Sequence, residues 1–185
     1  MRIKRWAFGS AAALAVALTG MAQPAGASPT GEEGPDTLEA TMAGTLEANP
    51  GSRQIAENVI QLDEGITLTL PTNERSVQAA SDCPSGWQCA WPHSNFRGPR
   101  LAAERCVYLN YFEWVFWNDL EGVYEDFAYD ASSVYNNIPG VTWSQFWSPA
   151  NGANYNAHFG APEDYVGAQW NDTFTAAQGC SGAAG

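Results

Sequence analysis

The chain has little positive charge. It holds 8 Lys and Arg against 20 Asp and Glu, which gives a formal net charge of −12 at pH 7. Three of the basic residues lie within residues 1–27, and without that segment the balance is 5 − 20 = −15. So acidic a surface repels polyanions, which argues against a nucleic-acid partner. It would attract cations or a basic protein.

Signatures of the common catalytic sites are also missing. The sequence has no Gly-x-Ser-x-Gly nucleophile turn, no His-Glu-x-x-His zinc motif and no phosphate-binding loop. The acids that a carboxylate-based hydrolase would need fall in one stretch: Glu113, Asp119, Glu121, Glu125 and Asp126. Nothing in the sequence indicates that two of them converge, so we predict that the chain is not an enzyme.

Residues 1–27 have the pattern of a secretory signal peptide. Basic residues precede an apolar run from Trp6 to Ala22, and small residues follow up to Ala27. A membrane anchor is the alternative, but the run is short for a bilayer and no basic stop-transfer flank follows it. We predict cleavage after Ala27 and a secreted, extracellular product that does not associate with a membrane.

The even number of cysteines in an exported chain predicts two disulfides. The four are Cys83, Cys89, Cys106 and Cys180. Three pairings are possible, and the short first spacing favours Cys83 with Cys89, which leaves Cys106 with Cys180. A zinc site is the alternative, but the spacing is not that of a zinc finger and only His93 and His158 could add ligands.

The chain divides into two regions after the signal peptide pattern, residues 28–81 and residues 82–185. Residues 28–51 have few large apolar side chains, which predicts a flexible, acidic lead up to residue 81. Within it, alternating apolar residues around Asp63-Glu64-Gly65 predict a β-hairpin over residues 54–70. Residues 82–185 are rich in Trp, Tyr and Phe among turn residues, which favours an all-β domain. Apolar residues from Leu109 to Phe127 recur at helical spacing and predict a short helix there.

The most specific local motif is Trp91-Pro92-His93-Ser94-Asn95-Phe96-Arg97-Gly98. In a folded hairpin the two aromatics would close a corner and Gly98 would take a positive φ. The hydroxyls of Ser132 and Ser133 would cap its unpaired backbone groups.

The motif from Trp91 to Gly98 occurs together with three other segments, Cys83–Cys89, Phe127 and Asn171–Thr175. With this set the chain resembles the secreted bacterial βγ-crystallin-type proteins, in particular the actinobacterial metalloproteinase inhibitors. The resemblance covers about Cys83 to Cys180. It implies a sandwich of two Greek-key motifs, the second from about Trp143 to Ala176, with an aromatic insertion from Tyr111 to Asp126 in the first.

The resemblance also implies a candidate calcium site, although no cofactor is required. In that family an acidic or amide pair and a following hydroxyl supply oxygen ligands, and the matching residues are Asn171, Asp172 and Thr175. A turn capped by these side chains is the structural alternative, because the last serine of the family pattern is Ala176 here.

Peptidase inhibition is the function that the resemblance implies, with an extracellular protease, preferably a metalloprotease, as the partner. A disulfide-rigidified loop would serve as the contact, and the candidates are Cys106, Val107 and Tyr108. The alternative is that Val107 belongs to a core strand. Two other functions stay open, a calcium-tuned structural domain and a glycan-binding or toxin-like domain using exposed aromatics, for which the candidates are Trp114, Trp117, Trp143 and Trp147.

Overall fold

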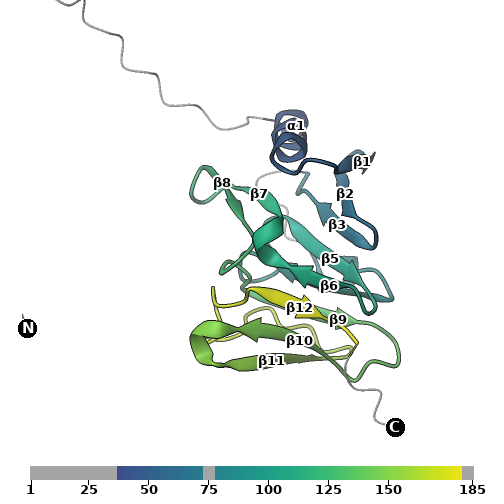
Figure 1. Cartoon of the computed structure of the whole chain (residues 1–185), viewed down its shortest axis with the longest axis vertical. Coiled ribbons are helices and arrows are strands. Elements are labelled where there is room, and N and C mark those ends of the chain that lie inside the picture. The colour runs from purple at the N-terminus through teal and green to yellow at the C-terminus, as the bar shows by residue number, and fades with distance from the viewer. Residues whose placement is uncertain (1–36, 73–77, 181–185) are drawn as a thin grey trace, which may run out of the picture. The chain divides into compact units, whose positions relative to one another are not determined.

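The structure is a computed structural model that describes residues 37–72 and 78–180 (Figure 1). The predicted signal peptide lies outside these residues. The helical elements are α1 (Leu38–Ala48) and the 3-10 turns η1 (Ala80–Asp82), η2 (Tyr111–Glu113) and η3 (Pro149–Asn151). The strands are β1 (Arg53–Ala56), β2 (Val59–Asp63), β3 (Ile66–Thr69), β4 (Trp87–Trp91), β5 (Arg100–Glu104), β6 (Tyr108–Asn110), β7 (Val115–Asn118), β8 (Val123–Asp126), β9 (Ser133–Asn137), β10 (Trp143–Ser148), β11 (Ala153–His158) and β12 (Ala176–Gln178). In the described part of the chain, no helix is long and apolar enough to cross a membrane.

The strands form two larger antiparallel sheets and one separate hairpin, which confirms the all-β fold class (Figure 1). The first sheet has six strands in the order β1-β2-β3-β5-β4-β9. The second has four in the order β11-β10-β12-β6. Strands β7 and β8 form the hairpin.

The two sheets exchange strands. After β4 and β5, the chain leaves the six-stranded sheet and β6 pairs with β12, before β9 returns to β4. In the second half, β10, β11 and β12 share one sheet, while Glu163 between β11 and β12 bridges to Val134 of β9 in the other. This reciprocal exchange is consistent with the two Greek-key motifs that the resemblance implies.

One cluster of buried side chains includes residues of both sheets. Strand β10 shows why: Ser144, Phe146 and Ser148 are buried, whereas the alternate residues are partly exposed. The ring of Phe146 packs on that of Phe174 with centroids 5.4 Å apart. Hydrophobic burial of this kind is the main source of stability for such a sandwich.

Helix α1 differs from the flexible lead that the sequence predicts for residues 28–51. Thr37 caps the helix, because its Oγ1 accepts a hydrogen bond from the first turn at 3.1 Å. Met42 is 4% exposed and belongs to the main core cluster. Asn49 donates to the carbonyl oxygen of Val115 at 2.8 Å and accepts from its N–H at 2.9 Å. Contacts with distant residues therefore hold this helix, and these cannot be read from its sequence, which has only a weak apolar stripe.

The hairpin predicted over residues 54–70 corresponds to β2 and β3, with Gly65 in the turn at a φ of 69°. Strand β3 also pairs with β5, from Ile66 opposite Ala103 to Thr69 opposite Arg100. The hairpin is thus continuous with the six-stranded sheet. It lies in the same compact unit as residues 82–180.

The aromatic insertion contains only one helical turn, η2, in place of a longer helix. Its later residues form the β7–β8 hairpin, in which Phe116 is buried and the ring of Trp117 packs on Tyr124 at 5.1 Å. Aromatic and β-branched residues suit strands as well as helices, and Gly122 at a φ of 69° provides the hairpin turn. The helical spacing of its apolar residues is therefore not realised.

Candidate functional site

The motif from Trp91 to Gly98 forms a folded hairpin that Ser133 closes. The Oγ of Ser133 accepts from the N–H of Phe96 at 3.2 Å and donates to the carbonyl oxygen of His93 at 2.7 Å. The rings of Trp91 and Phe96 meet edge to face with centroids 5.0 Å apart, and Gly98 has a φ of 81°. The aromatic corner, the glycine and the hydroxyl cap are confirmed.

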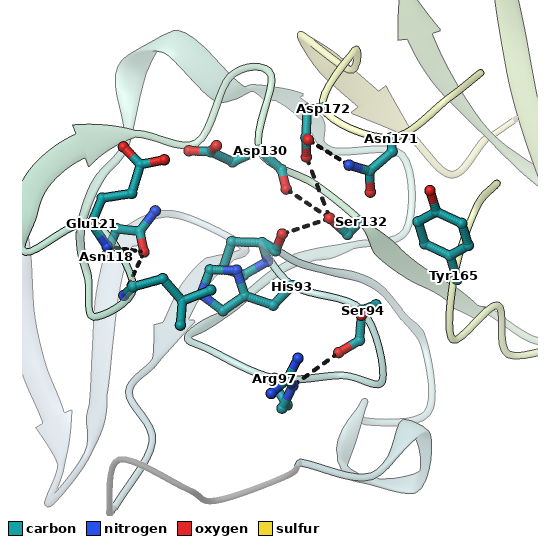
Figure 2. Close-up of a pocket in the computed structure, with 12 residues that line it drawn as sticks. His93, Ser94, Arg97, Asn118, Glu121, Asp130, Ser132, Tyr165, Asn171 and Asp172 are labelled. Atoms are coloured by element: carbon teal, nitrogen blue, oxygen red, sulfur yellow. Dashed lines mark hydrogen bonds between the residues drawn. The ribbon is translucent and has the colours of Figure 1, made fainter. Parts of the chain in front are cut away.

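Beside this hairpin lies a polar pocket of about 320 Å³ (Figure 2). Its side chains come from the hairpin, the β7–β8 turn and the loops that precede β9 and β12. The charged or titratable ones are His93, Arg97, Glu121, Asp130, Tyr165 and Asp172. Figure 2 shows the hydroxyl of Ser132 between the backbone of Asp130 and the carboxylate of Asp172, to which it donates at 3.3 Å.

Three carboxyl groups line this pocket, and burial shifts the pKa of two of them, Asp130 and Asp172. Burial raises the pKa of Asp130 to about 7, and the nearby charges of Glu125 and Asp172 add to the shift. Burial also raises the pKa of Asp172, against the opposing effects of its hydrogen bond from Ser132 and of His93. The pocket therefore holds one carboxyl group that gains or loses its proton near neutral pH.

Only two of the three predicted calcium ligands line this pocket. Asn171 and Asp172 line it, but Thr175 does not and is buried elsewhere. The side-chain amide of Asn171 donates to the Asp172 carboxylate, and Thr173 donates to the carbonyl oxygen of Trp170 at 2.7 Å, so the capped turn is formed. The described ranges contain no group of three or more His, Cys, Asp or Glu side chains that could hold a metal ion. Calcium binding at Asp172 stays a prediction, in which Ser132 would be a better placed hydroxyl than Thr175.

The five acids considered for hydrolysis do not converge as one site. Glu121 lines the pocket, and Glu125 lies beside Asp130. Asp119 pairs with His93 at 3.4 Å, whereas Glu113 accepts from the side chain of Asn110 at 2.8 Å. Asp130 was not among these candidates; its place just before the capping serines was the signal that could have drawn attention to it.

Asp130→Asn is expected to raise the melting temperature by roughly 3 °C at pH 8 and to change it little at pH 4. The pKa of about 7 in the folded state lies above the ordinary value of 3.8, so the folded chain keeps a proton that the unfolded chain has lost. The contribution of Asp130 to stability is therefore lost as the pH rises through that interval. Asparagine cannot ionise, and about 1 kcal/mol should be recovered after solvent screening of this half-exposed group.

The measurement is thermal unfolding at both pH values in the presence of a chelator. Glu57→Gln, at an exposed acid outside the pocket, is the control and should show no such pH dependence. An equal rise at pH 4 and pH 8 would contradict the assignment of the effect to ionisation.

The predicted contact loop, Cys106 to Tyr108, leads from a tight turn into β6. The N–H of Val107 donates to the carbonyl oxygen of Glu104 at 3.1 Å, and Cys106 has a φ of 66°. Both expected disulfides, Cys83–Cys89 and Cys106–Cys180, are present. Tyr108 is 56% exposed, whereas Val107 is half-buried and packs against the main core cluster, in line with the core-strand alternative.

Hydrogen bonds fasten this turn to three neighbouring segments. Glu104 donates its N–H to the carbonyl oxygen of Gly65 at 2.9 Å, and Arg105 to that of Gly86 at 3.1 Å. Cys106 donates to the carbonyl oxygen of Gly179 at 3.3 Å, and its own carbonyl oxygen accepts from the side chain of Gln178 at 3.3 Å. We call residues 104–108 the locked turn, because a disulfide and these bonds together fix its backbone.

The folded hairpin, the first disulfide and the locked turn all lie in one stretch of the chain. Residues 77–159 match the family model of peptidase inhibitor family I36. No curated protein and no solved structure matches the chain. The I36 match includes the locked turn and Ser133, but it excludes Cys180 and the Asn171–Thr175 turn.

The match to family I36 confirms the resemblance to peptidase inhibitors over this stretch. It supports a peptidase-inhibitor-like function with a peptidase as the partner. Members of such a family act by binding a peptidase, so the prediction that the chain is not an enzyme is confirmed on this ground. The likeness to I36 names no particular class of peptidase.

Proposed function

We propose that the chain is a secreted inhibitor of an extracellular metallopeptidase and that the locked turn is its contact surface. The observation that carries this proposal is that the turn is both exposed and ordered before binding. Arg105, Cys106 and Tyr108 are exposed, while the disulfide to Cys180 and four hydrogen bonds hold the backbone of the locked turn. A loop that is already ordered loses little conformational freedom on binding, which favours a tight complex that dissociates slowly.

The chemistry of the locked turn supports a metallopeptidase. A thermolysin-like enzyme places a substrate carbonyl beside its zinc and accepts a bulky apolar side chain next to the attacked bond. Of the two bulky apolar side chains in the turn, Tyr108 is exposed, whereas Val107 is half-buried. The resemblance of the sequence to metalloproteinase inhibitors points to the same class.

Secretion is supported by two features. Residues 1–27 have the order of a signal peptide. The locked turn depends on a disulfide, and disulfides persist in oxidising compartments outside the cytosol. An extracellular peptidase is the partner that such a product would meet.

The experiment is a titration of a thermolysin-like metallopeptidase and a subtilisin-like serine peptidase with the exported, oxidised protein. We expect loss of metallopeptidase activity near equimolar ratio. Tyr108→Ala should raise the inhibition constant at least tenfold, because a central exposed aromatic is the kind of residue that dominates an interface. Val107→Gly is less informative, because Val107 also packs on the core.

Tyr165→Ala is the matched control, because Tyr165 is also a partly exposed tyrosine, at 46%, but lines the polar pocket. It should inhibit as the unaltered protein does. Inhibition of the serine peptidase alone would refute the metallopeptidase target and keep the inhibitor class. No inhibition of either enzyme at large molar excess would refute the proposed function.

A further inference from the structure

The outward face of the four-stranded sheet carries aromatic and amide side chains. The burial pattern of β10 and its register with β11 place on this face Trp143, Gln145, Trp147, Asn154, Asn156 and His158. In Figure 1 the two strands lie side by side at the edge of their sheet, with β12 and β6 beyond them. We call the surface formed by Trp143, Gln145, Trp147, Asn154 and Asn156, together with Tyr108 of β6, the aromatic face.

Two rings of this face are held against each other. Trp147 pairs in register with Ala176 of β12, and the ring of Trp147 lies 5.7 Å from that of Tyr108, on the strand beyond. The small Ala176 side chain leaves room for this contact and is only 4% exposed. The pair therefore forms a platform whose orientation is fixed before any ligand arrives.

A third ring extends the platform along the sheet. Trp143 points to the same side of β10 as Trp147, four residues away, which corresponds to roughly 13 Å along a strand. Gln145 lies between the two tryptophans, and Asn154 and Asn156 on β11 lie beside them. The result is a strip of rings with amide groups along it, which suits an extended ligand better than a compact one.

The aromatic face holds no Asp, Glu, Lys or Arg, although the chain has 20 acids, and His158 beside Trp143 is neutral in the formal charge. In the registers of β6, β10, β11 and β12, none of the outward residues of these described strands is Asp, Glu, Lys or Arg. A basic protein would be attracted to the acidic remainder of the surface in preference to this face. An uncharged ligand is therefore the complement to it.

We propose that the aromatic face binds a neutral, β-linked polysaccharide. The C–H faces of sugar rings can stack on Trp143, Trp147 and Tyr108, and sugar hydroxyls can exchange hydrogen bonds with the amides of Gln145 and Asn156. This site shares Tyr108 with the locked turn, but its other residues lie on β10 and β11, and the proposal goes beyond the inhibitory function. Its role would be to hold the inhibitor on a glycan surface where peptidases act.

The test is calorimetric titration of the exported, oxidised protein with the β-1,4-linked hexamers of glucose and of N-acetylglucosamine. We expect saturable binding of at least one hexamer with quenching of tryptophan fluorescence. Trp143→Ala and Trp147→Ala should each weaken the affinity at least tenfold. Gln145→Ala, which leaves the rings in place, should weaken it several-fold and provides a test if a tryptophan variant unfolds.

Trp117→Ala is the matched control, because Trp117 is a partly exposed tryptophan that packs on Tyr124 in the β7–β8 hairpin. It should bind the hexamer with unchanged affinity. Absence of saturable binding at millimolar hexamer would refute the proposal. So would an affinity for the hexamer in Trp143→Ala, Trp147→Ala and Gln145→Ala that equals the affinity of the unaltered protein. A loss of peptidase inhibition in Trp143→Ala without glycan binding would instead assign the face to the peptidase interface. Tyr108 is left out of this test because it also belongs to the locked turn.

Discussion

Replacing Cys106 and Cys180 together by alanine is expected to lower the free energy of unfolding by about 4 kcal/mol. The bridge closes a loop across 74 residues, and a cross-link of that span removes much of the conformational freedom of the unfolded chain. Denaturant unfolding followed by tryptophan fluorescence measures the change. The same variant should lose at least a hundredfold in inhibitory potency, because the locked turn would have to be ordered during binding.

The second disulfide supplies the control. Cys83 and Cys89 are separated by only 6 residues, so their joint replacement by alanine should cost about 2 kcal/mol on the same entropic basis. It should also leave the potency less affected, since Cys106 and Cys180 stay joined. Equal losses of stability in the two variants would contradict the loop-length argument. Full potency without the Cys106–Cys180 bridge would refute the locked turn as the contact.

Gly98→Ala is expected to destabilise the protein by about 3 kcal/mol. The φ of 81° is unfavourable for a residue with a side chain by about 1 kcal/mol or more. In addition, the new Cβ would lie 2.7 Å from Cγ of Pro92 and 3.1 Å from Cδ2 of His93, which adds the strain of overpacking. The corner of the folded hairpin has no space for the methyl group, and denaturant unfolding gives the change in stability.

Gly160→Ala separates the two contributions to this effect. Gly160 has a similar φ of 71°, but a Cβ there meets no described atom within 4 Å. Its replacement should cost only about 1 kcal/mol, from the backbone conformation. If both variants lose the same stability, the hairpin relaxes around the methyl group and the close packing at Gly98 is unimportant.

Short-range patterns predict the local parts of this fold well. The motif from Trp91 to Gly98 contains its own corner, and the capping Ser133 is recognisable by its hydroxyl. The alternation in β3 likewise identifies a strand. Helix α1 escapes prediction because Met42 and Asn49 are fixed by residues far away in sequence, not by a strong apolar stripe.

In the candidate sites, too, local features can be predicted from the sequence, whereas contacts between residues far apart in the chain cannot. Separation along the chain favours the bridge between Cys83 and Cys89, and the remaining pair follows. The meeting of Tyr108 with Trp147 depends on the strand order β10-β12-β6, which no local pattern encodes. The raised pKa of Asp130 is caused first by burial and then by the charges of Glu125 and Asp172, and only the fold buries Asp130 and brings Asp172 near.

The β2–β3 hairpin has an effect that reaches beyond its own residues. Strand β5 pairs with β4 on one side and with β3 on the other, so the hairpin covers an edge that residues 77–159 alone would leave open. Open, regular edges invite other chains to add strands and aggregate. In the longer chain the outermost strand is β1, whose four residues are exposed and whose register with β2 is irregular. The β2–β3 hairpin and β1 together thus replace a regular open edge with a short, irregular one that resists the addition of further strands.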